Sequence, residues 1–174
     1  MKKEKCIIVG PSGSGKDHLL RGLIRKGLKY LPKFTTRPKR SLEREGVDYN
    51  YLTNEEFDEL KEKSEIKVSQ TFIINDCTWH YGISKYNFDN SQVLIMTPYE
   101  LSQLSEDDFK NTFIVYIDID METRRRRISN RNDNNDSVER RLESDEKDFQ
   151  NFKKYDLKIT DPDFESEWVY SLMY

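Results

Sequence analysis

The stretch KCIIVGPSGSGKDHLLRGLI, residues 5–24, decides the fold. Its apolar start predicts a short buried strand over 5–9, a glycine-rich turn follows over 10–16, and leucines then recur at helical spacing over 17–30. With the spacing G-x-x-x-x-G-K, inward-facing backbone N–H groups, the helix dipole and a lysine ammonium can bind a phosphate chain together. We therefore predict a nucleotide-binding phosphate loop whose binding residues are Ser12, Gly13, Ser14, Gly15, Lys16 and Asp17.

Asp17 stands where loops of this kind usually carry a Ser or Thr whose hydroxyl binds magnesium. In a first helical turn an aspartate gains about 0.3–1 kcal/mol from the helix dipole, which is sufficient reason for its presence. Its carboxylate is also a ligand type that magnesium prefers, either directly or through water, so Asp17 is a candidate metal ligand. The third interpretation is an impaired metal site, and the sequence leaves all three open.

The chain of 174 residues fits one domain, and its later segments alternate strands with helices. Strands are predicted at 93–96, 112–117 and 156–160, and helices at 98–104, 120–131, 137–152 and 164–174. This order predicts an α/β fold with a central parallel sheet flanked by helices. A capping box at Thr53 and Glu56 and two β-rich runs indicate an insert over about 34–85, with a core of 1–33 and 86–174.

Composition narrows the function classes. A net charge of −3 argues against a general nucleic-acid binder, which carries a basic excess. No apolar run is long enough to span a membrane, and the basic start leads into no signal-peptide core, so a cytoplasmic protein without membrane contact is expected. Cys6 and Cys77 are too few for a disulfide framework, and we expect both to be reduced and buried.

Further motifs follow the phosphate loop in a fixed order: TTRPKR at 35–40, GVDY at 46–49, YGIS at 81–84, and a Tyr-Asp pair at 155–156. In this order, over nearly the whole chain, they resemble the guanylate kinase family of P-loop nucleoside monophosphate kinases. The resemblance implies transfer of the γ-phosphoryl group of ATP, with magnesium, to GMP or a similar nucleoside monophosphate. It also implies an acceptor-phosphate site made by Arg37, Arg40, Tyr49 and Tyr81.

A run of four arginines, Arg124 to Arg127, opens the segment of about 124–141 that corresponds to the arginine lid of the family. Arginines in a closing lid can stabilise the charge on a transferring phosphoryl group. The residues expected to be catalytic are Lys16, Arg37, Arg127, Arg131 and Arg141. The other arginines of the segment, Arg124, Arg125, Arg126 and Arg140, are expected on the helix surface.

The chain also departs from the family pattern. Phe72 occupies the position of a glutamate that accepts hydrogen bonds from guanine, and Met96 and Pro98 replace two aspartates. Each guanine N–H group left without a hydrogen-bond partner costs about 1–3 kcal/mol of binding free energy. The sequence therefore does not determine which base the acceptor nucleotide carries. The loop ending GPSGSGKD is similar to that of ribose 1,5-bisphosphate phosphokinases, which gives an alternative function. A catalytically inactive guanylate-kinase-like interaction module is a second alternative, and either a monomer or a homodimer is expected.

Overall fold

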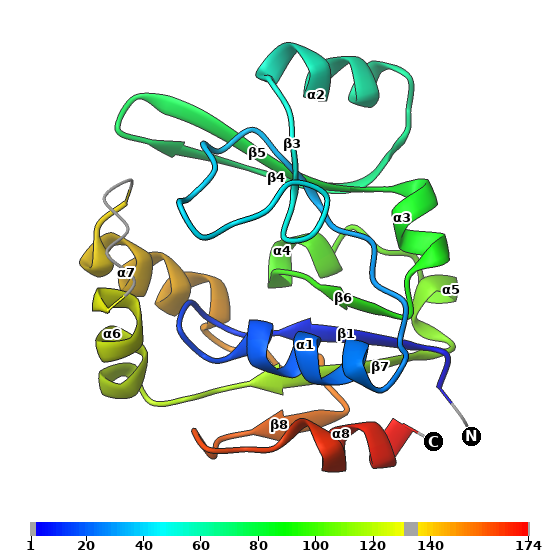
Figure 1. Cartoon of the computed structure of the whole chain (residues 1–174), viewed down its shortest axis with the longest axis vertical. Coiled ribbons are helices and arrows are strands. Elements are labelled where there is room, and N and C mark those ends of the chain that lie inside the picture. Colours follow the sequence, from blue (N-terminus) through cyan, green and yellow to red (C-terminus); the bar gives the residue numbers. More distant parts are fainter. Residues whose placement is uncertain (1–2, 131–135, 174) are drawn as a thin grey trace. The chain divides into compact units, whose positions relative to one another are not determined.

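The computed structural model describes residues 3–130 and 136–173 of the 174-residue chain (Figure 1). The chain divides into two compact units. The core unit comprises Met1–Lys29 and Gln92–Tyr174, and the insert unit comprises Tyr30–Ser91.

A four-stranded parallel sheet organises the core unit, in the order β6-β1-β7-β8. These strands are β1 (Lys5–Val9), β6 (Val93–Ile95), β7 (Thr112–Ile117) and β8 (Leu157–Ile159). Ile7 pairs with Leu94 on one side and with Ile114 on the other. The apolar residues of β1 are fully buried, as expected for a central parallel strand that is covered on both faces. The predicted parallel sheet is therefore confirmed.

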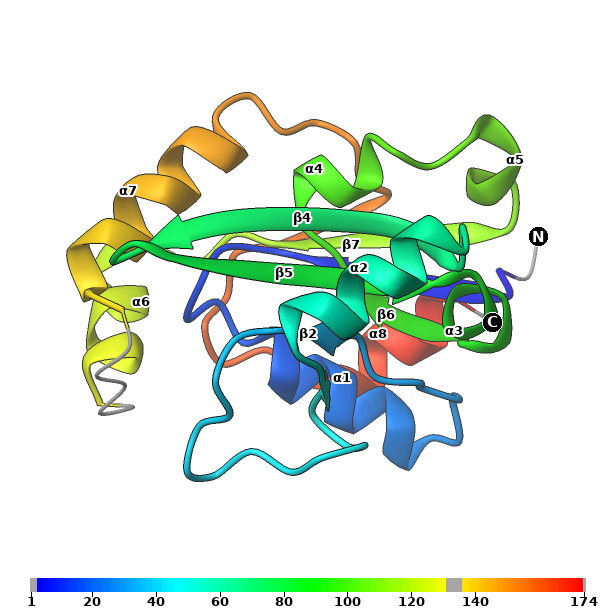
Figure 2. The ribbon, with the colours of Figure 1, turned by 90° about the horizontal axis from the view of Figure 1, so that it is seen from above.

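Helices cover both faces of this sheet (Figures 1 and 2). On one face lie α1 (Lys16–Arg25) and α8 (Ser166–Met173), side by side; on the other lie α4 (Pro98–Leu101) and α7 (Val138–Phe149). The remaining helices are α5 (Glu106–Phe109) and α6 (Met121–Ser129). Helix α1 is shorter than predicted because the chain turns after Arg25, where Gly27 adopts a φ of 94°.

Helices α1 and α8 approach closely at Gly22. A Cβ atom at this glycine would lie 2.0 Å from Oγ and 2.3 Å from Cβ of Ser166. The absence of a side chain at position 22 therefore sets the spacing of the two helices.

The insert unit contains a second four-stranded sheet, in the order β3-β2-β5-β4. Its strands are β2 (Phe34–Thr35), β3 (Asn50–Tyr51), β4 (Ile66–Ile74) and β5 (Cys77–Ser84), and its helices are α2 (Asn54–Glu62) and α3 (Lys85–Asn90). Strands β4 and β5 form an antiparallel hairpin, whose turn is Asn75-Asp76 with both φ angles positive, at 50° and 60°.

Helix α2 covers one face of this hairpin. The predicted capping box is confirmed, since Thr53 accepts from the Glu56 N–H and Glu56 accepts from the Thr53 N–H. The buried Phe57 of α2 stacks on His80 and lies so close to Gly82 that a Cβ there would be 2.8 Å from the phenyl ring. Because side chains alternate along a strand, Tyr81 belongs to the opposite face, together with its pairing partner Gln70.

The two cysteines differ in environment. Cys6 is buried as expected, and desolvation raises the pKa of its thiol to about 12. The prediction that Cys77 is buried is wrong, because this residue follows the hairpin turn directly and is exposed. Among residues 3–130 and 136–173, no helix has both the length and the apolar character that a membrane span requires.

Candidate active site

The phosphate loop joins β1 to α1 in the core unit. Gly13 and Gly15 have φ angles of 75° and 105°, which favour glycine, and Gly15 is the N-cap of α1. A Cβ at Gly13 would lie 2.8 Å from the backbone oxygen of Arg124, so helix α6 packs directly against the loop. The structure thus brings the predicted residues, Ser12, Gly13, Ser14, Gly15 and Lys16, into one tight turn at the start of a helix.

Two side chains of the loop have an arrangement suited to an anionic ligand. Lys16 Nζ donates to the carbonyl oxygens of Gly10 and Pro11, at 2.6 and 2.8 Å, so its ammonium group lies against the loop. The Ser14 hydroxyl is completely buried and has no hydrogen-bond partner within the described part of the chain. An unsatisfied buried hydroxyl costs about 1–3 kcal/mol, and a bound phosphate oxygen would satisfy it. Asp17 lies exposed in the first turn of α1.

Arg127 contacts the carbonyl groups of the phosphate loop. Its Nη1 donates to the oxygens of Gly13 and Ser14, at 3.3 and 3.4 Å, and its Nη2 donates to Pro162 O at 2.8 Å. This guanidinium therefore links α6, the loop and the segment after β8. The structure places Arg127 in support of the loop backbone, while Arg131 lies outside the described residues.

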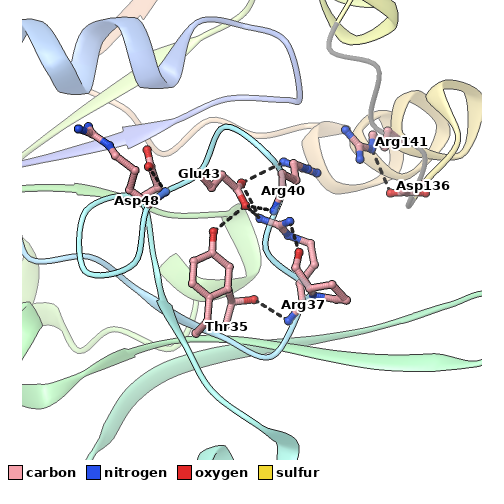
Figure 3. A network of polar contacts seen from close by, with 10 residues as sticks. Thr35, Arg37, Arg40, Glu43, Asp48, Asp136 and Arg141 are labelled. Atoms are coloured by element: carbon pink, nitrogen blue, oxygen red, sulfur yellow. Dashed lines mark hydrogen bonds and ion pairs between the residues drawn. The ribbon is translucent and has the colours of Figure 1, made fainter.

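Arg141, the other predicted lid arginine, is buried in α7. Its Nε donates to a carboxylate oxygen of Asp136 at 3.1 Å (Figure 3), and Arg140 pairs with the same carboxylate. Desolvation alone raises the pKa of Asp136, but the two arginines outweigh it and hold this pKa below the usual range. Asp136 was not predicted from the sequence, although its spacing of four and five residues from two arginines is a recognisable signal.

The expectation that Arg124 lies on the helix surface is wrong. Arg124 is buried, its Nε donates to Ile119 O at 3.0 Å, and its Nη1 lies 3.6 Å from a carboxylate oxygen of Asp145. It shares this buried face of α6 with Ile128, four residues later, and the face packs against the phosphate loop. Arg125 and Arg126 are exposed, as expected.

In the insert unit, three hydrogen-bond donors and one further guanidinium group converge on the carboxylate of Glu43 (Figure 3). Arg37 Nη2 binds both of its oxygens, at 2.7 and 2.9 Å. The backbone N–H of Arg40 donates at 2.8 Å, and the Tyr51 hydroxyl donates at 2.6 Å. Arg40 Nη1 lies 3.5 Å from the same carboxylate. Neither Glu43 nor Tyr51 was predicted as a site residue; a glutamate three residues after Arg40 was the available signal.

Two further tyrosines complete the predicted acceptor group. The Arg37 guanidinium lies 5.5 Å from the ring centre of Tyr49, and the rings of Tyr49 and Tyr81 meet edge to face at 6.0 Å. The charges of Arg37 and Arg40 act on the Tyr81 hydroxyl. The structure therefore gathers all four predicted residues, Arg37, Arg40, Tyr49 and Tyr81, within the insert unit; we call them the arginine–tyrosine cluster.

The protonation states of this cluster suit an anionic ligand. Desolvation by burial lowers the pKa of Arg37, but Tyr81 and Glu43 more than offset it and raise this pKa above the ordinary arginine value. Desolvation raises the pKa of Tyr81, despite the nearby charges of Arg37 and Arg40. At neutral pH Arg37 is thus charged and Tyr81 is protonated, so both side chains can donate hydrogen bonds to a phosphate.

Comparisons with known proteins agree with this arrangement. The profile of the guanylate kinase family matches residues 2–170. The guanylate kinase of Nostoc sp. is 30% identical over 169 residues, which cover 92% of this chain and 83% of the relative. That of Mycoplasma genitalium is 28% identical, with 91% and 69% covered. The fold is similar to the crystal structure of guanylate kinase from Anaplasma phagocytophilum, with a TM-score of 0.70, 19% identity, and 99% and 86% of the two chains covered. The chain belongs to the guanylate kinase family.

Proposed function

We propose that this protein transfers the γ-phosphoryl group of ATP to the phosphate of GMP. The observation that carries the proposal is the arginine–tyrosine cluster of the insert unit, in which Arg37 and Arg40 lie at one carboxylate, Glu43, and Arg37 lies beside the rings of Tyr49 and Tyr81. A nucleotide-phosphate loop in the same chain supplies the donor site. On this basis we assign acceptor binding to the insert over about 34–85 and lid closure to the segment of about 124–141.

The chemistry requires alignment and charge stabilisation more than proton transfer. The acceptor phosphate is already ionised, so no strong general base is needed. We assign donor binding to Lys16 and the loop amides, and acceptor binding to Arg37, Arg40, Tyr49 and Tyr81. Arg141 and Arg131 are proposed to stabilise the charge on the group in transfer, with Arg127 holding the loop that binds the donor.

Magnesium suits this site through Asp17. Magnesium is usually bound by one or two carboxylates together with substrate phosphates and water, and the exposed carboxylate of Asp17 lies in the first turn of the helix that follows the loop. Within the described part of the chain, no group of three His, Cys, Asp or Glu residues is placed to hold a metal by itself. Bound there, magnesium would neutralise phosphate charge. We further propose a cytoplasmic enzyme, monomeric or homodimeric, that contacts neither nucleic acid nor membrane.

A coupled assay of ATP consumption tests the function. The acceptors are GMP, dGMP, AMP, UMP, CMP and ribose 1,5-bisphosphate, and we expect turnover with GMP. The Arg40→Ala variant should lose at least tenfold in kcat/KM for GMP, since a charge-assisted contact contributes about 1.5–3 kcal/mol. Lys39→Ala, which removes an exposed charge next to it, should keep full activity. If only the sugar phosphate is phosphorylated, the assignment of GMP as the acceptor is wrong. If ATP binds but no acceptor is phosphorylated, the proposed kinase activity is wrong.

A further inference from the structure

A carboxylate lies directly against the phosphate loop. Asp145 of α7 accepts a hydrogen bond from the backbone N–H of Ser12 at 2.8 Å, although the two residues are 133 positions apart. The Asp145 side chain is only 14% exposed. Negative charge beside a loop that binds phosphates is unfavourable for that ligand, so its presence requires a compensating role.

Arg124 supplies part of the compensation. Its side chain is 8% exposed, and its Nη1 forms an ion pair with the Asp145 carboxylate at 3.6 Å and has no hydrogen-bond partner in the described part of the chain. The Arg124 Nε donates to Ile119 O, just before α6. Asp145 therefore joins three pieces of the core unit: the phosphate loop, α6 and α7.

Asp145 lies one helical turn after Arg141 on α7, and residues four apart share a helix face. The hydrogen bond that holds Asp145 against the loop therefore also fixes the rotation of α7 about its own axis. That rotation sets the direction in which the Arg141 side chain extends from α7. The Arg141 guanidinium itself donates to Asp136, at 3.1 Å.

We propose that Asp145 is a positioning residue for phosphoryl transfer. Its hydrogen bond to Ser12 N–H holds α7 in register with the phosphate loop, so that Arg141 is placed for the donor phosphates; this inference rests on the proposed function. The positioning depends on the hydrogen bond from Ser12 N–H to Asp145, whereas the negative charge of Asp145 is balanced by Arg124. The effect should therefore depend on the presence of a hydrogen-bond acceptor at position 145 and on Arg141.

Two substitutions of nearly equal shape separate the bond from the charge. Asp145→Asn keeps an acceptor oxygen for Ser12, whereas Asp145→Leu does not, and both remove the charge beside Arg124. We expect Asp145→Leu to lower kcat about tenfold relative to Asp145→Asn, with KM for ATP changed less than threefold. In an Arg141→Ala background the same pair should differ less than twofold in kcat, because the position acts through Arg141. Glu146→Ala, which removes a neighbouring exposed carboxylate of α7, is the control and should match wild type.

Several results overturn the proposal. Equal kcat for the Asn and Leu variants, or a difference of the same size with and without Arg141, means that Asp145 has a structural role only. Should the Leu variant fail to fold, Asp145→Ala replaces it in the same comparison. Hydrogen exchange gives a readout without activity: the Ser12 amide should be protected in wild type and in Asp145→Asn, and rapid exchange in wild type excludes the bond. A wild-type protein that turns over no acceptor overturns the function instead, while protection of this amide still reports on the bond.

Discussion

Arg37 and Glu43 form a nearly buried ion pair in which one guanidinium nitrogen binds both carboxylate oxygens, at 2.7 and 2.9 Å. The Arg37 side chain is 1% exposed and that of Glu43 is 15% exposed. The same carboxylate also receives the Tyr51 hydroxyl and the Arg40 N–H. The orientation of Arg37 is therefore set by the protein before any phosphate binds, which lowers the cost of ordering this side chain on binding.

Replacing Glu43 by Gln should make stability less dependent on pH. Desolvation raises the pKa of Glu43, but hydrogen bonds from Tyr51, Arg37 and Arg40 outweigh it, so this pKa lies below the ordinary value of 4.5. The ionised carboxylate thus stabilises the fold above that value, and the stabilisation is lost as the pH falls through the folded-state pKa. At pH 7 we expect the free energy of unfolding of Glu43→Gln to be about 1–3 kcal/mol lower than that of wild type.

Urea unfolding at pH 7, 5 and 4 measures this difference. The difference in free energy of unfolding between wild type and Glu43→Gln should decrease from pH 5 to pH 4. Glu62→Gln, which changes an exposed glutamate at the end of α2, should follow the wild type at every pH. A gap that stays constant over this range would show that the charge of Glu43 contributes nothing.

Removing the Tyr81 hydroxyl should weaken acceptor binding. Tyr81→Phe keeps the ring contacts with Tyr49 and Phe72, at 6.0 and 5.7 Å, and deletes only the hydroxyl, on which the charges of Arg37 and Arg40 act. A lost hydrogen bond to a charged phosphate is worth about 1.5–3 kcal/mol. We expect KM for GMP to rise at least tenfold and kcat to change less than threefold in steady-state assays. The exposed Tyr86 provides the control, since Tyr86→Phe should leave both constants unchanged.

Features set by short-range spacing were predictable. The glycine loop, the strand at Thr112–Ile117 and the capping box of α2 depend on residues that lie within a few positions of one another. The sequence therefore identified the phosphate loop, and the family motifs identified the four residues of the arginine–tyrosine cluster.

Features that depend on tertiary contacts were not predictable. The burial of Arg124 follows from the packing of α6 on the phosphate loop, which nothing within α6 reveals. The bond from Ser12 to Asp145 joins residues 133 positions apart. From the sequence, Glu43 is one charged residue among many, because its three hydrogen-bond donors become neighbours only when β3 and the loop before it are folded. In a chain with 35% charged residues, charge alone marks no site.

Substituting Gly22 by Ala should destabilise the core unit. The new Cβ would lie within 2.0 Å of Ser166 Oγ and 2.3 Å of its Cβ, so α8 or α1 must shift. Overpacking of this kind costs about 1–3 kcal/mol, which exceeds the gain of up to ~1 kcal/mol in helix propensity. Thermal unfolding should show a lower Tm for Gly22→Ala. The second change Ser166→Gly should restore part of it, and a Gly22→Ala variant as stable as wild type would contradict the close packing.

Asp17 should determine the magnesium requirement if its carboxylate contacts the metal. Asp17→Ala removes the ligand, and Asp17→Ser introduces a hydroxyl, the group most often found at this position. We expect Asp17→Ala to need at least fivefold more magnesium for half-maximal activity, and Asp17→Ser to lie between it and wild type. Glu122→Ala, in the first turn of α6, controls for loss of a carboxylate at a helix start. Unchanged magnesium curves for both Asp17 variants would restrict this residue to helix stabilisation.

Phe72 should limit the preference for guanine. Its ring meets that of Tyr81 edge to face at 5.7 Å, so it lies beside the arginine–tyrosine cluster and offers no hydrogen-bond acceptor to a base. Apolar contacts discriminate between ligands of similar size by about 10–200-fold, whereas a site that hydrogen-bonds its substrate reaches about 10⁴-fold or more. We therefore expect the ratio of kcat/KM for GMP over AMP to fall within the lower range in the wild-type protein.

Introducing a carboxylate at this position tests the cause. Guanine carries N–H donors on the edge where adenine has a bare ring nitrogen, so Phe72→Glu should raise the GMP-over-AMP ratio at least tenfold, mainly through a lower KM for GMP. Ile73→Glu is the matched control: residue 73 is the next on β4, is 77% exposed, and belongs to the other face of the strand, so its ratio should equal that of wild type. If Phe72→Glu leaves the ratio unchanged, the base is read elsewhere. If Ile73→Glu raises it equally, the added charge acts at long range and position 72 has no special role.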